Sequence, residues 1–352
     1  MRSYSLGIVA VLILCTAMPL WADSISPGTY STTLGVGGTA TITKTVSITQ
    51  QSAAPVDVFF LMDTTGSMGG TLDSVQSGFG GIITDVSPLS SNIYWGVGNY
   101  NDCRDGAGDC PAGTLGLAYT QNQDLTANTS AVQTALNGLF ASGGGDGPES
   151  NLYGLYGAAT EASWRLDSQR FLFWAGDYEA WDPRQGVTEA IATAALVNAN
   201  IATYALNVGA GRLDILGQAT RITTATGGEL LAGGYSEAAD LIKAALEGAL
   251  LNYSTVSLDV VGLTSGVGVG FMPISFTGAY DRSIARDFVF DVTFEGLAPG
   301  TYNFEVVARV DGAIVAREAD SITVGAIPEP ASLVLLGTGL GMIGLAAWRR
   351  KK

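Results

Sequence analysis

The stretch "VDVFFLMDTTGSMGG", residues 56–70, decides the fold of this chain. Its first seven residues are almost all apolar and do not alternate with polar ones, which indicates a β-strand covered on both faces. The run ends on Asp63, and Thr65, Ser67 and a glycine pair follow at once. A buried strand that leads into a polar turn and a helix start is typical of an α/β protein.

The same alternation continues on both sides of that turn. From about residue 54 to 254, apolar β-rich runs alternate with helical stretches, which predicts an α/β fold with a doubly wound, mainly parallel, Rossmann-like sheet. The predicted strands are 56–63, 93–100, 117–120, 170–176, 201–208 and 229–232. The predicted helices lie near 70–86, 127–140, 151–165, 186–199, 212–225 and 236–252.

The composition changes after Leu251. The runs "TVSLDVVGL", "DFVFDVTFEGL", "GTYNFEVVARVDG" and "SITVGA" are short strands separated by turns, and they predict an antiparallel β-sandwich over residues 255–325. Residues 40–50 alternate as a half-buried strand does. Because a lone strand needs a partner, we expect segment 23–53 to pair with this sandwich, so that the domain of residues 54–254 is inserted in it rather than simply followed by it.

Composition excludes several functions. The chain has 352 residues, a formal charge of −15 and no histidine. The negative charge disfavours nucleic acid as a partner. The lack of imidazole excludes Ser-His-Asp triads and histidine-based zinc sites.

Both ends of the chain have the pattern of targeting segments. Residues 1–22 have the charged, apolar and small-residue zones of a secretory signal peptide. Near the other end, the uncharged stretch from Ala331 to Trp348 would form a helix about 27 Å long, just enough to span a bilayer. A buried core helix is the alternative, but the basic residues 349–352 favour a transmembrane helix with the body of the protein outside.

The C-terminal pattern resembles a known sorting signal. Pro328, Glu329 and Pro330, followed by the apolar helix and a basic tail, are similar to the PEP-CTERM signal over residues 326–352. The resemblance implies recognition by an exosortase, a transient inner-membrane anchor, and delivery to the cell surface or extracellular matrix of a Gram-negative bacterium that makes exopolysaccharide, as in a biofilm.

The mature chain keeps two cysteines, Cys103 and Cys110, in a glycine-rich loop. In an oxidising compartment they are expected to form a disulfide. A zinc pair is the weaker alternative, because no second cysteine pair or histidine completes a tetrahedron.

Three acidic loops follow or precede elements of the predicted sheet. They are Asp63 with Thr65 and Ser67, the sequence "GGGDGPES" at 143–150, and Asp177 at the end of a strand. Open parallel sheets bind ligands at the carboxyl ends of their strands. Carboxylates and hydroxyls are the hard oxygen ligands that Mg²⁺ or Mn²⁺ selects, and converging acids need a cation to neutralise them. Alternatively, Asp63 could simply cap a helix.

The motif Asp63-x-Thr65-x-Ser67 resembles the metal-ion-dependent adhesion site of von Willebrand factor A domains, with threonine in place of the first serine. The sequence "DGPES" resembles a loop of integrin β subunits, which implies that Glu149 is a ligand. Asp177 matches the last acidic position of the family. The resemblance covers about residues 54–254 and implies a metal bound by Asp63, Thr65, Ser67, Glu149 and Asp177.

Integrin β subunits bind a second ion beside the first. The resemblance implies that Asp102, Asp146 and Glu149 could hold it, with Ca²⁺ as the expected ion. The asparagine that the family has two residues before Asp146 is Gly144 here.

The implied function is binding and not catalysis. An acidic group of a partner, either a protein or an acidic polysaccharide, would replace water on the metal. The first alternative is a structural matrix component whose metal only stabilises the fold. The second is a Mg²⁺-dependent phosphoryl-transfer enzyme, because "DTTGS" also resembles the phosphorylated loop of P-type ATPases. No lysine occurs between Lys44 and Lys243 to hold a phosphoryl group, which counts against that enzyme.

Overall fold

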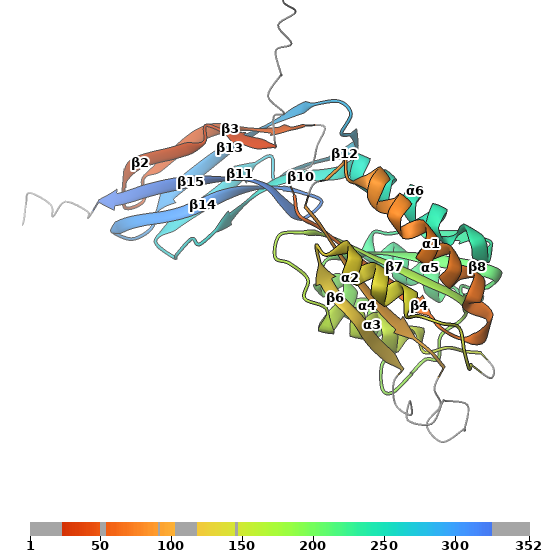
Figure 1. Cartoon of the computed structure of the whole chain (residues 1–352). Coiled ribbons are helices and arrows are strands. Elements are labelled where there is room, and N and C mark those ends of the chain that lie inside the picture. The colour runs from red at the N-terminus through yellow and green to blue at the C-terminus, as the bar shows by residue number, and fades with distance from the viewer. Residues whose placement is uncertain (1–22, 50–53, 91, 103–117, 145–146, 326–352) are drawn as a thin grey trace, which may run out of the picture.

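The computed structural model describes residues 23–49, 54–90, 92–102, 118–144 and 147–325. These residues form an α/β domain and a β-sandwich joined end to end (Figure 1). The signal peptide, Cys103, Cys110, Asp146 and the PEP-CTERM segment lie outside the described residues. Within the described ranges, no helix has the length and apolar character needed to cross a membrane.

One six-stranded sheet forms the centre of the α/β domain. Strand β4 lies inside it, parallel to β5 on one side and β7 on the other, and only the edge strand β6 runs antiparallel to its neighbour. In spatial order the strands are β6 (Tyr119–Thr126), β5 (Ile93–Tyr100), β4 (Val56–Asp63), β7 (Gln169–Tyr178), β8 (Ile201–Arg212) and β9 (Leu230–Gly233).

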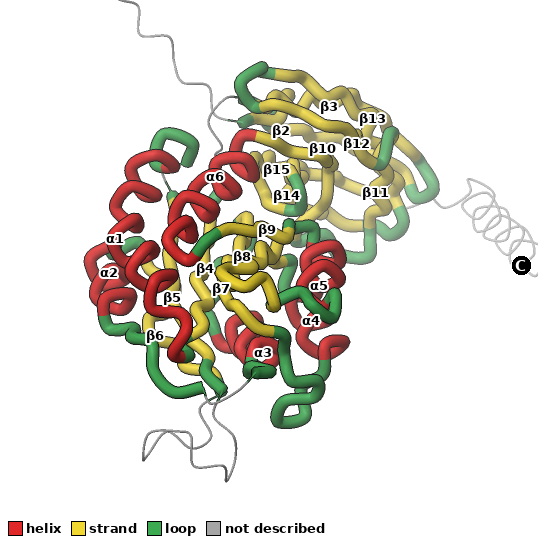
Figure 2. The backbone as a smooth tube through the Cα atoms, turned by 90° about the vertical axis from the view of Figure 1, so that its right-hand side faces the viewer, coloured by secondary structure: helices red, strands yellow, loops and turns green. Residues whose placement is uncertain are grey.

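Helices cover both faces of this sheet (Figure 2). One apolar cluster packs beneath the first, second and last helices, and a second cluster packs beneath the other three. The helices are α1 (Gly69–Val86), α2 (Thr129–Asn137), α3 (Asn151–Glu161), α4 (Glu189–Asn198), α5 (Gln218–Thr226) and α6 (Ala238–Leu251). All eight residues of β4 are buried, as expected for a strand covered on both faces.

Several predicted bounds were wrong, including the ends of the strand at 201–208 and the helix at 151–165, and two differ by six residues. The strand predicted at 117–120 runs from Tyr119 to Thr126, because this polar edge strand lacks the apolar run that reveals the interior strands. The helix predicted from residue 212 begins only at Gln218, because β8 continues to Arg212. Gly209 and Gly211 have positive φ angles, which let the strand bend where a helix was expected.

The sandwich has a four-stranded and a five-stranded sheet. In the first, the order is β1 (Ser24–Ser26), β3 (Thr39–Ile48), β13 (Arg286–Gly296) and β11 (Val267–Met272). In the second, it is β12 (Ser275–Asp281), β10 (Asn252–Val261), β14 (Gly300–Val310), β15 (Ala313–Gly325) and β2 (Thr29–Gly35). The sequence interpretation missed β1, β2, β11 and β12.

The chain crosses between the two domains twice. Strand β3 pairs antiparallel with β13, and the chain leaves it for β4. It returns directly from α6, which ends at Leu251, into β10, which begins at Asn252. Strand β15 runs parallel to β2, so the sandwich is not wholly antiparallel. The α/β domain therefore lies between two strands of the sandwich in the chain.

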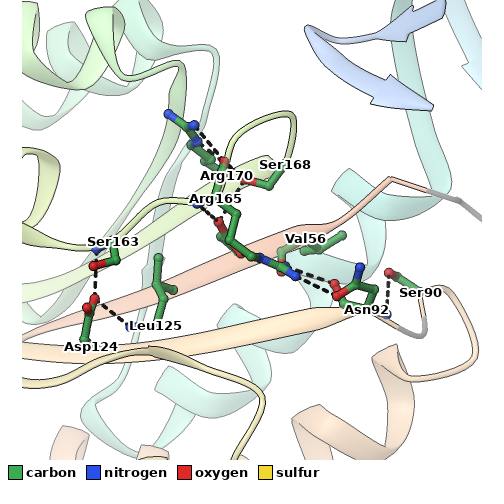
Figure 3. A network of polar contacts seen from close by, with 10 residues as sticks. Val56, Ser90, Asn92, Asp124, Leu125, Ser163, Arg165, Ser168 and Arg170 are labelled. Atoms are coloured by element: carbon green, nitrogen blue, oxygen red, sulfur yellow. Dashed lines mark hydrogen bonds and ion pairs between the residues drawn. The ribbon is translucent and has the colours of Figure 1, made fainter. Parts of the chain in front are cut away.

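A closed polar network fixes the amino end of the large sheet (Figure 3). Arg165 donates to the carbonyl of Val56 at 2.7 Å and to Asn92 Oδ1 at 2.6 Å. Its Nε donates to the buried Asp57 at 2.6 Å, and Ser168 donates to the same carboxylate at 2.8 Å. The starts of β4, β5 and β7 are thereby held together.

Candidate metal centre

Asp63 lies at the carboxyl end of β4, where the order of the sheet reverses. The chain proceeds from β4 to β5 and β6 on one side and then returns to β7 on the other. This is the position at which open α/β sheets bind ligands. Asp63 is fully buried, and its Oδ1 accepts from the amide of Thr65 at 2.8 Å. Among the described residues, no group hydrogen-bonds to its Oδ2.

Hydrogen bonds join the loop after β4 to the loop before α3. The amide of Gly66 donates to the carbonyl of Gly143 at 3.0 Å, and the amide of Ser142 donates to Thr64 at 2.9 Å. Asn101 Nδ2 donates to the carbonyls of Thr64 and Ser142, at 3.0 Å each. The first two predicted acidic loops are therefore held side by side.

Glu149 is tied to the chain that follows β7. Its amide donates to the carbonyl of Glu179 at 2.8 Å, and its carbonyl accepts from the amide of Trp181 at 2.9 Å. This short parallel bridge with residue 180 places the buried Glu149 beside the loop that begins at Asp177. All three predicted loops therefore meet at one edge of the sheet.

A pocket of about 310 Å³ opens where these loops meet. Its walls include four predicted ligand residues, which are Thr65, Ser67, Glu149 and Asp177. The fifth, Asp63, lies against Gly176, where an added Cβ would stand 3.7 Å from Asp63 Oδ2 and 2.3 Å from the hydroxyl of Tyr100. Glycine is therefore needed at position 176 to leave room for the hydroxyl of Tyr100.

Burial dominates the electrostatics of Asp63. Loss of solvent raises its pKa from 3.8 to about 7, hydrogen bonding with Thr65 opposes this rise, and the charges of Asp177 and Asp102 add to it. Burial also raises the pKa of Tyr100 well above its ordinary value, with the charge of Asp63 as a further cause. A cation would favour the ionised form of Asp63, which its surroundings oppose.

Three residues near the site were not predicted from the sequence. The hydroxyl of Tyr235 donates to Asp177 Oδ2 at 2.9 Å. The exposed guanidinium of Arg212 stacks on Tyr178, 4.0 Å from the ring centre, and both line the pocket. The third residue, Arg184, lies near Asp102. Tyr235 follows β9 and carries no motif. The one sequence signal is Gly209, where a Cβ would collide with the Tyr235 ring.

The residues expected to hold a second ion are only partly placed. Asp102 is buried, and Arg184 Nη2 lies 4.0 Å from its Oδ1. Glu149 lines the pocket, while Asp146 lies outside the described residues. Arg184 supplies part of the positive charge that a second cation would bring to Asp102.

The donor set fits a cation with mixed ligands. Over the described ranges, no three Asp, Glu, His or Cys side chains gather in the way that a metal held by such groups alone requires. Two buried oxygens, Asp63 Oδ2 and Thr65 Oγ1, make no hydrogen bond within those ranges. Such atoms need a partner, and an ion bound by carboxylates, hydroxyls and water would supply one.

A larger cavity of about 520 Å³ lies between the two domains. It is lined by residues of β7, β8, β10 and β12 and contains none of the predicted ligand residues. The candidate site therefore rests on its chemistry and not on size.

Comparisons with known proteins identify the C-terminal segment. Residues 326–351 match the PEP-CTERM protein-sorting motif. This confirms the predicted sorting signal and indicates an exported protein that an exosortase processes. No curated protein matches the chain.

Two solved structures show a distant likeness to this chain. The open form of the pilus adhesin SpaC from Lactobacillus rhamnosus GG is 12% identical, with a TM-score of 0.40, and the match covers 81% of this chain and 45% of that one. Proximal thread matrix protein 1 from the mussel byssus, solved with a zinc-occupied MIDAS motif, is 13% identical, with a TM-score of 0.42, covering 58% of this chain and 48% of that one. This chain thus spans less than half of each protein, and at these TM-scores the likeness assigns no family.

Proposed function

We propose that this exported protein binds partners through a divalent cation held in a site of the von Willebrand factor A type. Mg²⁺ or Mn²⁺ would be bound by Asp63, Thr65, Ser67, Glu149 and Asp177. The observation that carries the proposal is the meeting of three loops in one pocket, lined by Thr65, together with the neighbouring Asp63, whose buried Oδ2 has no hydrogen bond within the described residues. A cap or a turn would use that oxygen in hydrogen bonds.

The residue types suit binding better than catalysis. Hydroxyl ligands such as Thr65 and Ser67 hold a cation without neutralising it, so a bound ion would keep a strong affinity for one more anionic oxygen. Glu149 adds a negative charge and weakens that tendency. Among the described residues, the walls of the pocket contain no histidine, cysteine or lysine.

The chemistry at the rim supports an acidic partner. Arg212 is exposed at the edge of the pocket, although the chain as a whole carries a charge of −15. A carboxylate of a protein or of an acidic polysaccharide would meet both the cation and this guanidinium. We infer that Arg212 contributes to the attraction of the partner without binding the cation.

Isothermal titration of Mg²⁺ and Mn²⁺ into the chelator-treated protein tests the site. Saturable binding is expected for the wild type and for Asp85→Ala, a carboxylate at the far end of α1 that pairs with Lys243 at 3.0 Å. Asp63→Ala and Glu149→Ala should lose it. Equal binding by Asp63→Ala would place the ion elsewhere and end the proposal.

A second assay separates adhesion from a purely structural cation. Beads coated with carboxylates should retain the protein in Mg²⁺ and release it in chelator, whereas beads coated with hydroxyls should not retain it. Arg212→Ala should weaken retention and leave the titrated cation affinity unchanged. Cation binding without any retention would favour the structural matrix role over adhesion.

A further inference from the structure

A charged cluster lies sealed inside the sandwich, in the other domain from the cation site. Lys44 projects inward from β3, and Glu318 and Asp320 project inward from β15 in the facing sheet. None of the three side chains has any exposed surface. Lysine and acidic side chains are almost never fully buried unless they are paired, so this cluster requires an explanation.

The cluster is unbalanced as a set of ion pairs. One ammonium faces two carboxylates, and within the described ranges neither acid forms an ion pair with any other residue. Transfer of the proton from Lys44 to Asp320 would reduce the buried charges from three to one, on Glu318, and each buried charge is costly in an apolar core. Burial lowers the pKa of Lys44, with the charge of Asp320 opposing this, and burial raises the pKa of Asp320, with Lys44 opposing that. Both shifts favour a neutral amine beside a neutral carboxylic acid.

The geometry gives the two acids different roles. Lys44 Nζ lies 3.4 Å from Asp320 Oδ1 and 3.2 Å from Oδ2, and its approach to Oδ2 does not have hydrogen-bond geometry. The nitrogen therefore faces the whole carboxyl group and not a single lone pair. Glu318 contacts the same nitrogen through Oε1, and its Oε2 makes no hydrogen bond within the described residues.

Aromatic rings close the site to water. The Tyr30 ring centre lies 5.7 Å from Lys44 Nζ, and Tyr30 stacks on Phe294 at 5.5 Å. Phe304, which is paired with Asp320 across the strands, packs on Phe294 at 5.9 Å. A dry site favours the loss of water in a condensation and protects the product from hydrolysis.

We propose that Lys44 and Asp320 become joined by an amide bond, with Glu318 as the catalytic proton carrier. The lone pair of the neutral Nζ attacks Cγ of the protonated Asp320, and a C–N bond forms as the carbonyl opens. The Glu318 carboxylate takes a proton from the nitrogen and passes it to the departing hydroxyl. The C–O bond then breaks, and an amine and a carboxylic acid have become an amide and one water. Glu318 ends as it began, so no co-reactant is needed.

The bond would join the two sheets of the sandwich. It would also fasten β15, the last described strand, which leads directly to the sorting motif at residue 326. A pull on the C-terminus could then not strip β15 from the domain while the bond held. The proposal is independent of the cation site, because none of its three residues lies in the α/β domain.

Peptide mass spectrometry of the purified full chain, reduced and digested after denaturation, tests the bond. The expected product is a branched peptide that joins Lys44 to Asp320 and is lighter than its two linear parts by one water. Linear peptides with unmodified Lys44, from protein that unfolds cooperatively by circular dichroism, would overturn the proposal. A branch at Glu318 would overturn the assignment of the roles.

A variant tests the role of Glu318. Glu318→Gln keeps the size of the side chain but cannot take the proton, so the branched peptide should be absent or accumulate much more slowly after refolding. Glu295→Gln, at an exposed position of β13, is the matched control and should behave as the wild type does. Branching of Glu318→Gln at the wild-type rate would remove Glu318 from the chemistry.

Discussion

The two ends of strand β4 each carry a fully buried aspartate, and the two aspartates have different surroundings. At the amino end, both oxygens of Asp57 accept hydrogen bonds, from the amide and Nε of Arg165 and from Ser168. At the carboxyl end, Asp63 receives one bond from Thr65, and its Oδ2 receives none within the described residues. The carboxylate of Asp57 has all its partners within the structure, whereas Asp63 Oδ2 has none among the described residues and Thr65, to which Asp63 is hydrogen-bonded, lines a pocket.

The sandwich contains a third arrangement. Glu318 and Asp320 are sealed with Lys44, so no exchangeable ion can reach them. Asp63 is also buried, but it is hydrogen-bonded to Thr65, which lines a pocket that opens to solvent. Solvent access thus distinguishes the two sites. A cation from solution can pair with Asp63, whereas only the amine of Lys44 can pair with the sealed carboxylates.

The largest expected effect is at the amino end of β4, where both oxygens of Asp57 accept hydrogen bonds. Arg165→Ala leaves the charge of Asp57 buried without its partner, so the free energy of unfolding should fall by about 3–5 kcal/mol. Cation affinity of the folded protein should not change. Urea unfolding measures the first and titration the second. In the control, Arg221→Ala, the pair with Glu189 is more exposed and the loss should be much smaller. Equal losses in the two variants would contradict the comparison.

At the carboxyl end of β4, Asp63 should make the free energy of unfolding depend on pH. The folded-state pKa of Asp63 is raised from 3.8 to about 7, so the folded protein holds this proton more tightly than the unfolded chain does. Without divalent cations, the contribution of Asp63 to stability should therefore be greatest below about pH 4 and be lost as pH rises toward about 7, by at most about 4 kcal/mol.

Unfolding of Asp63→Asn across this range isolates the effect. The variant should lack this part of the pH dependence, while Asp85→Asn, an exposed control, should keep it. If Asp63→Asn retains the wild-type slope of stability against pH, the ionisation of Asp63 does not cause this pH dependence.

These differences also explain which parts of the fold and of the candidate site could be predicted from the sequence. The bounds of β4 and β5 were predicted as observed, because an interior strand is one continuous apolar run. The three loops that meet at the pocket were singled out because the carboxyl ends of parallel strands meet, whereas Tyr178 and Arg212, which also line it, were not. Tyr235 and Arg184 were not predicted, because they reach the site from loops whose course is set by tertiary packing.

The sealed cluster did leave a sequence signal that was not used. In β3, Lys44 lies on the same face as Ile42 and Val46. In β15, Asp320 lies on the same face as Ile322. A charged residue therefore occupies a position of the apolar face in each strand. Alternation alone could place these residues inward, but it could not pair β3 with β15, which lie in different sheets.

The next effect concerns the hydroxyl of Thr65. Its Oγ1 is buried and makes no hydrogen bond within the described residues, so Thr65→Val should leave the stability of the cation-free protein unchanged or slightly higher. At a Mg²⁺ concentration of about 100 times Kd, the wild type should gain about 2.7 kcal/mol and the variant almost nothing.

Thermal unfolding with and without Mg²⁺ measures both values. The matched control is Thr223→Val, which loses a buried hydroxyl that donates to the carbonyl of Ala219 at 2.9 Å. It should lose about 1 kcal/mol of stability and keep the full gain from Mg²⁺. A loss of stability in cation-free Thr65→Val would show that its hydroxyl has a structural partner.

The smallest effect lies at Tyr235, whose hydroxyl donates to Asp177 Oδ2 at 2.9 Å. Tyr235→Phe should cost about 1 kcal/mol of stability, and it should change cation affinity a few-fold because Asp177 loses the group that orients it. Tyr302→Phe in the sandwich removes a bond of similar length, from its hydroxyl to the carbonyl of Ala298 at 3.0 Å. Its stability should fall by a similar amount while titration of Mg²⁺ stays at the wild-type affinity. An unchanged affinity in both variants would mean that Asp177 needs no support from Tyr235 to hold the ion. Cation binding at the carboxyl end of β4 would then depend on Asp63 and its neighbouring hydroxyls alone.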